Sequence, residues 1–189
     1  MNTDLLLLAD SRLPAGGHAH SGGVEPAAAA GIVEDLAGLA DFLRGRLATS
    51  GLVAAALAAS ACTLATDRAP SSGTASPQAG AALSSARVRK LTYEPTAAAE
   101  WVRLDGEADA RTPSPAQRAA SRAQGRSMLR AVRTAWPSPV LDELRAAIPG
   151  GPHQPLVVGA ATAVMRGSPG DAAAITAYDP DRSTWSEVR

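Results

Sequence analysis

The sequence predicts an all-α protein, and three features of its composition support that prediction. Of the 189 residues, 43 are alanine, the residue with the highest helix propensity. Aromatic residues make up only 3% of the chain, whereas strands favour aromatic and β-branched side chains. Apolar residues make up 46%, which is enough to build a hydrophobic core. The length suits one domain, so we predict a single compact helical domain over residues 1–189.

The first third of the chain contains several predicted helices. Residues 5–8 form a short apolar run that ends before the turn signal of Pro14, Gly16 and Gly17, and the alanines at 27–30 favour a second short helix. From Asp35 onward the apolar residues follow helical spacing and predict one buried stripe, made of Leu36, Leu39, Ala40, Leu43 and Leu47. Gly51 interrupts this pattern. Residues 52–64 then continue as a helix that is almost entirely apolar, so we expect it to be central.

The composition changes between 66 and 95, where proline, glycine and serine cluster, and we predict a mobile loop or insertion there. Helical character returns at Thr96 and continues toward Asp109. The next helix has a clear start signal, because Ser114 can cap it, Pro115 suits the first position and Gln117 stands where a capping-box partner belongs.

That helix is expected to end near Trp136, because Pro137 follows. Its expected apolar side runs from Ala120 or Ser121 through the positions Gly125, Met128, Leu129, Val132 and Trp136. Shorter helices are predicted at 140–148, 154–165 and 169–178. The remaining residues, 179–189, read as a short polar tail.

Charge and motif content exclude several functional classes. The 18 basic and 18 acidic residues cancel, whereas binders of nucleic acid or anionic membranes carry a positive surplus. The single cysteine, Cys62, excludes an internal disulfide and a cysteine-rich zinc site. Lys90 is the only lysine and no glycine precedes it at P-loop spacing, so this chain has no P-loop. Nucleophile-elbow, HExxH and dinucleotide motifs are absent too, and we predict a protein that is not an enzyme.

Two apolar segments, at the N-terminus and at residues 47–66, could in principle be a secretory signal or a membrane span. The N-terminal segment carries Asp4 and has no basic region before its apolar run, so it does not resemble a secretory signal. Residues 47–66 are uncharged and long enough to span a bilayer, but most of them are alanine, serine, threonine or glycine, which contribute little to insertion. We therefore predict a buried core helix, no membrane association and a cytoplasmic protein.

A glycine-rich loop near the N-terminus holds the first candidate functional residues. His18 and His20 form an H-x-H pair that could reach one divalent ion, but two ligands without a third donor make a poor metal site. Contact with a partner protein, nickel ligation and a plain loop role therefore remain alternatives. Ser21 is predicted to cap the following helix, which would place Glu25 near its positive end.

The second candidate is an arginine stripe on the predicted helix from 115 to 136. Arg118, Arg122, Arg126 and Arg130 recur every four residues and share one helix face. Such a stripe is either a solvated face or a docking face for an acidic partner surface. Gly125 costs this helix about 1 kcal/mol relative to alanine, which suggests the close approach of another helix or of a partner.

Four segments together resemble the urease accessory protein UreF family in its actinobacterial form. The most specific is residues 8–25, which contain Leu13-Pro14-Ala15-Gly16-Gly17-His18-Ala19-His20-Ser21. The others are residues 41–47, residues 109–126 and the run from Pro152 to Gly159. The resemblance covers most of residues 5–65 and 96–178. It departs from the family at 66–95, where the chain has extra sequence, and after Tyr178, where relatives continue into further helices and the chain is expected to be shortened.

The resemblance implies an all-helical adaptor without catalytic activity, which forms a homodimer within a larger complex. Its implied partners are UreD (also called UreH), the GTPase UreG and apo-urease, and the complex would act as a chaperone that inserts nickel. No cofactor is expected to be bound tightly, because nickel is handled by the complex. The residues that the matching segments and the loop suggest for partner binding are His18, His20, Ser21, Glu25, Arg118, Ser121, Arg122, Gln124, Gly125 and Arg126. A helical interaction module and a direct nickel carrier that uses His18 and His20 are the alternatives.

Overall fold

The computed structural model describes residues 3–8, 23–68 and 96–185, and every regular element in these ranges is a helix. The all-α prediction is therefore confirmed. In chain order the elements are α1 (Thr3–Leu8), α2 (Val24–Ala29), α3 (Leu36–Arg46), the π-helical turn η1 (Leu47–Gly51), α4 (Leu52–Thr66), α5 (Ala97–Ala110), α6 (Pro115–Ala135), α7 (Pro139–Ala147), α8 (Gln154–Val164) and α9 (Pro169–Trp185). Most of the predicted insertion, residues 69–95, lies outside the described residues.

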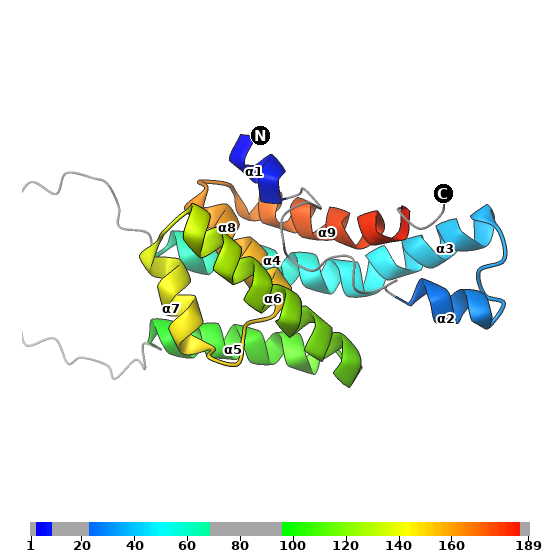
Figure 1. Cartoon of the computed structure of the whole chain (residues 1–189), viewed down its shortest axis with the longest axis horizontal. Coiled ribbons are helices and arrows are strands. Elements are labelled where there is room, and N and C mark those ends of the chain that lie inside the picture. The colour runs from blue at the N-terminus through cyan, green and yellow to red at the C-terminus, as the bar shows by residue number, and fades with distance from the viewer. Residues whose placement is uncertain (1–2, 9–22, 69–95, 186–189) are drawn as a thin grey trace, which may run out of the picture.

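The predicted break at Gly51 is a widened turn within one long helix. Helices α3 and α4 and the turn between them form a continuous helix of 31 residues, Leu36–Thr66 (Figure 1). In the π-helical turn η1 the Thr49 hydroxyl donates to the Gly45 carbonyl at 2.8 Å and the Ser50 hydroxyl to the Arg46 carbonyl at 3.3 Å. Such turns add one residue to a helix without ending it.

Helix α4 is central, as its composition predicts. It packs mainly against α8 and α9, and α8 packs in turn against α6 (Figure 1). The contact between α4 and α8 depends on small residues, because a Cβ on Gly159 would lie 2.2 Å from the Ala58 carbonyl oxygen. Cys62 is buried at the same place. The largest fully buried side chains around this contact and beneath α5, α6 and α7 are Trp101, Met128, Leu141, Leu144 and Leu156.

Side chains cap two helices in the second half of the chain, one of them at the predicted position Ser114. Thr96 accepts a hydrogen bond from the Ala99 amide, and Ser114 accepts one from the Gln117 amide with Pro115 at the first helical position. These side chains satisfy amide groups that have no partner inside a helix. The last helix is longer than predicted, because α9 continues past Tyr178 to Trp185. Residues 179–185 of the predicted polar tail therefore lie within α9.

Helices α2 and α3 form an extension from the bundle, which we call the arm (residues 23–46). Among the described residues, the main hydrophobic core draws on α1 and on α4 through α9 and on no residue of the arm. Leu39 and Leu43 are buried as predicted, but Leu36 is 74% exposed, so the predicted stripe is wrong at its first residue. The N-cap of α2 is Gly23, not Ser21, and Glu25 lies in the first turn as expected.

The long helix also passes a test for membrane-spanning length and composition. Residues 36–66 contain an 18-residue window with a mean hydropathy of 1.7, of which 33% is buried. Within the described ranges it is the one helix that meets these criteria. Core helices meet the same criteria, and the packing of α4 against α8, α9 and α5 agrees with the prediction of a core helix.

Candidate functional site: a polar network around His153

The connection between α7 and α8 lies directly on α6, and Gly125 makes this contact possible. A Cβ on Gly125 would stand 2.0 Å from the Pro152 carbonyl oxygen and 3.1 Å from the Gln154 nitrogen. Glycine is needed on the connection as well, because Gly151 has a φ of +98° and lies against the Arg126 side chain. The close approach that Gly125 predicts is therefore confirmed, and its partner is a segment of the same chain.

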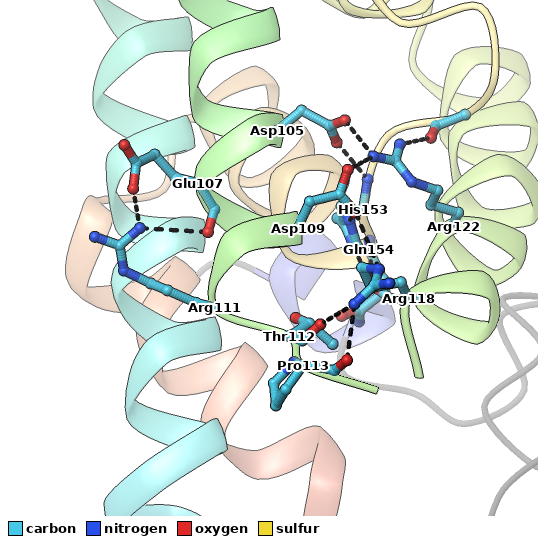
Figure 2. A network of polar contacts seen from close by, with 12 residues as sticks. Asp105, Glu107, Asp109, Arg111, Thr112, Pro113, Arg118, Arg122, His153 and Gln154 are labelled. Carbon is cyan, nitrogen blue, oxygen red and sulfur yellow. Dashed lines mark hydrogen bonds and ion pairs between the residues drawn. The ribbon is translucent and has the colours of Figure 1, made fainter. Parts of the chain in front are cut away.

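His153 is the centre of a polar network that joins α5, α6 and the start of α8 (Figure 2). Its side chain is almost fully buried, with the residue 1% exposed. The Nδ1 atom lies 3.0 Å from the Ser121 hydroxyl, and Nε2 lies 2.9 Å from Asp109 Oδ1. The His153 backbone amide donates to Asp105 Oδ1 at 3.0 Å. His153, the N-cap of α8, is thus bonded to both α5 and α6.

Arg122 closes the network from α6. Its Nη2 atom lies 2.8 Å from Asp105 Oδ2 and 2.6 Å from Asp109 Oδ2. Its Nη1 atom donates to the Gly151 carbonyl at 2.7 Å. Figure 2 shows the Arg122 side chain pointing toward Asp105 and Asp109. Asp105 is only 6% exposed, and a buried carboxylate needs such a cation and hydrogen bonds to offset its lost hydration. Arg122 therefore provides one cation shared by both carboxylates and holds the connection at the same time.

The hydrogen bonds of the network form one directed chain if His153 is neutral. The Gln154 amide donates to the Ser121 oxygen at 3.2 Å, Ser121 donates to Nδ1, and Nε2–H donates to Asp109. Serine, histidine and aspartate in this order are also found in hydrolases. Here the Ser121 oxygen is occupied by the Gln154 amide, and the imidazole is shielded from solvent. The arrangement is suited to holding helices in place, and a substrate in solution does not reach the buried imidazole of His153.

The structure changes the interpretation of the arginine stripe. The prediction of exposed arginines is wrong for Arg122, whose side chain is 23% exposed and holds two carboxylates. Arg118 donates to the Thr112 and Pro113 carbonyls at 2.6 and 2.9 Å. Arg126 and Arg130 are exposed, and Arg126 donates to the Gly150 carbonyl at 3.0 Å. A regular spacing of arginines places them on one helix face, but neighbouring segments decide which of them reach solvent.

The other predicted site residues lie apart from the network. Gln124 is partly buried on α6, and Glu25 is exposed on α2. His18, His20 and Ser21 lie outside the described residues. Within the described ranges no group of three or more histidine, cysteine, aspartate or glutamate side chains is placed to hold a metal ion. Nickel ligation by His18 and His20 therefore stays a prediction.

The sequence does not predict the three residues at the middle of the network, His153, Asp105 and Asp109. His153 lies in the run from Pro152 to Gly159 that resembles the family, but that run alone indicates no role for it. One signal was present, because Asp105 and Asp109 are four residues apart on a predicted helix and therefore share one face. Their partners, however, lie on other helices, and helical spacing within α5 does not reveal them.

The pKa of the Asp109 carboxyl lies below its ordinary value of 3.8, chiefly because the carboxylate accepts a hydrogen bond from His153, with Arg122 adding to the effect. Burial works to lower the pKa of the Arg122 guanidinium, but its hydrogen bonds to Asp109 and Asp105 outweigh burial and raise that pKa. Both directions favour the charged form, the carboxylate of Asp109 and the guanidinium of Arg122.

We expect an acid-sensitive contribution of Asp109 to stability. Because its pKa is lower in the folded than in the unfolded state, the carboxylate stabilises the fold above the unfolded pKa of about 4, and this contribution is lost as pH falls through the folded pKa. In urea titrations from pH 7 down to about pH 3, Asp109→Asn should lose less stability than the unchanged protein. Asp41→Asn, which alters an exposed pair with Arg44, is the control. Equal acid sensitivity of Asp109→Asn and the unchanged protein would contradict this expectation.

The fold and the network describe a helical protein whose polar residues position its helices. The sequence model of the UreF family matches residues 33–179. One similar protein is the urease accessory protein UreF from Mycolicibacterium vanbaalenii, which is 45% identical over 83% of this chain and 58% of the relative. Another is the urease accessory protein UreF from Mycobacterium sp. strain JLS, which is 42% identical over 93% of this chain and 66% of the relative. The chain belongs to the UreF family. It spans between half and two thirds of the length of these relatives, and no solved structure matches it significantly.

Proposed function

We propose that this protein is a non-catalytic adaptor in urease maturation. It would act in the cytoplasm as a homodimer that binds UreD/UreH, helps to recruit the GTPase UreG and assists nickel insertion into apo-urease. Nickel is cargo of the complex in this proposal and not a resident cofactor of the chain. The observation that carries the proposal is the match of the UreF family over residues 33–179, together with relatives whose name is urease accessory protein UreF.

The site supports an adaptor role in a specific way. The network around His153 uses its charged groups to hold α5, α6 and α8 together, so the outer faces of these helices have fixed relative positions. A rigid arrangement of this kind lowers the entropy that a docking surface loses on binding. An adaptor contributes surface and position, and this fold is built to supply both.

The proposal is tested by co-expression with tagged UreD/UreH and with UreG. The chain should co-purify with UreD/UreH, and UreG should join only when the chain is present. Replacing both His18 and His20 by asparagine should reduce urease activation in cells while nickel affinity of the isolated chain stays weak in both forms. Absence of the chain from the UreD/UreH fraction would overturn the adaptor role. Tight nickel binding that is lost on the double replacement would favour the direct-carrier alternative.

A further inference from the structure

Two parts of this neutral chain carry charges of mainly one sign. Residues 23–41 of the arm carry four carboxylates and no arginine or lysine, whereas α6 carries five arginines and no carboxylate. Figure 1 shows the arm at the end of the molecule opposite α7, with α6 crossing the middle. The protein therefore has an acidic end and a basic helix, although its net charge is zero.

Only some of these charged residues form ion pairs with other residues of the same chain. On the arm, Asp35 caps the Gly38 amide and Asp41 pairs with Arg44, which leaves Glu25 and Glu34 exposed and without an ion pair among the described residues. On α6, Arg118, Arg122 and Arg133 all face carboxylates. In the part of the chain that the structure describes, the other two arginines bond to neutral groups, Arg126 to the Gly150 carbonyl and Arg130 to the Ser127 hydroxyl.

Each of the two surfaces also offers an area for close contact. On the arm, Ile32 is 65% exposed and Leu36 is 74% exposed, beside Glu34. On α6, Ala119 and Ala123 share the exposed side with Arg126 and Arg130, because these positions follow helical spacing. Apolar residues at the centre with charges at the rim are the usual arrangement of an interface, and short alanine side chains admit a close approach.

We propose that two copies of this chain associate reciprocally, with the arm of each copy on the α6 face of the other. Glu25 and Glu34 would lie against Arg126 and Arg130, and Ile32 and Leu36 would lie over Ala119 and Ala123. The occupant is a second copy because the chain itself carries the complementary charges and apolar groups. A reciprocal contact uses both surfaces of both copies and closes the assembly at two. This inference rests on the homodimer of the proposed function and assigns its surfaces.

Charge reversal tests the assignment. The basic variant is Glu25→Arg with Glu34→Arg, and the acidic variant is Arg126→Glu with Arg130→Glu. Each places like charges at both contacts and should weaken self-association at least about tenfold, because opposed like charges disfavour an interface strongly. Mixed in equal amounts, the two variants should form a heterodimer, since every contact is then complementary again. Sedimentation velocity at about 50 mM salt measures both results, and salt near 0.5 M should dissociate the unchanged dimer by screening.

Folding controls keep the test decisive. Arg126 also contacts Gly150 and Gly151, so Arg130→Glu alone is the second acidic variant, and thermal unfolding should show each variant folded. Variants that dimerise like the unchanged chain would overturn this inference and leave the homodimer intact on another face. An unchanged chain that is monomeric at tens of micromolar would overturn both the inference and the homodimer. Retained dimerisation with loss of UreD/UreH or UreG binding would assign the α6 face to that partner instead.

Discussion

Replacing Gly159 by alanine should lower the free energy of unfolding by about 2–3 kcal/mol or more. The new Cβ would lie 2.2 Å from the Ala58 carbonyl oxygen and 2.8 Å from the Cys62 nitrogen. Both are backbone atoms of α4 and cannot turn aside, so the two central helices must move apart, and overpacking of this kind is costly. Urea denaturation followed by circular dichroism measures the change.

Gly106 provides the matched control for this substitution. It also lies inside a helix, α5, but an added Cβ there meets no atom within 4 Å. Gly106→Ala should therefore stabilise the protein by about 1 kcal/mol, because alanine is the better helix former. Replacing glycine by alanine should therefore lower the free energy of unfolding at position 159 and raise it at position 106. A Gly159→Ala protein as stable as the unchanged one would show that α4 and α8 are not in close contact.

The second large effect is expected at Arg122. Arg122→Ala removes the cation between Asp105 and Asp109 and leaves Asp105, 6% exposed, without its ion pair. Breaking a buried pair by removing one partner costs about 3 kcal/mol, and partial exposure of Asp109 and Arg122 makes about 2 kcal/mol the lower expectation. Denaturation at pH 7 measures the loss.

Two further substitutions separate charge from geometry at this position. Arg122→Lys should recover only part of the stability, since one ammonium group cannot serve two carboxylates and the Gly151 carbonyl as a guanidinium does. Arg130→Ala should change stability by less than about 0.5 kcal/mol, because its side chain is exposed. If Arg122→Ala is as mild as Arg130→Ala, the network contributes nothing to the fold.

Much of the helical order was predictable because its signals are local. Capping at Ser114, the stop before Pro137 and the apolar side of α6 follow from neighbouring residues, and the structure places them as expected. The exposure of Leu36 was not predictable, because it depends on how far the arm extends beyond the core. The end of α9 was missed for a similar reason, since polar composition alone does not exclude a helix.

The network around His153 was only partly predictable from the sequence. Gly125 predicted a close contact correctly, because a glycine that weakens a helix indicates that another segment approaches it closely. The arginines carried a misleading one, because spacing within α6 says nothing about carboxylates on α5. Asp109 precedes Arg122 by 13 residues, and His153 follows Ser121 by 32. Only the folded arrangement of three segments brings these groups together.

The polar bonds at the start of α8 have a consequence for how the protein opens. The amide hydrogens of His153 and Gln154 are bonded to side chains of two other helices, Asp105 on α5 and Ser121 on α6. The first turn of α8 therefore cannot fray as helix ends usually do, unless bonds to two other helices break in the same event. Segments joined in this way exchange and unfold as one cooperative unit. We therefore expect the start of α8 to exchange its amide hydrogens together with the segments around Asp105 and Ser121, and the arm, outside the main core, to exchange separately.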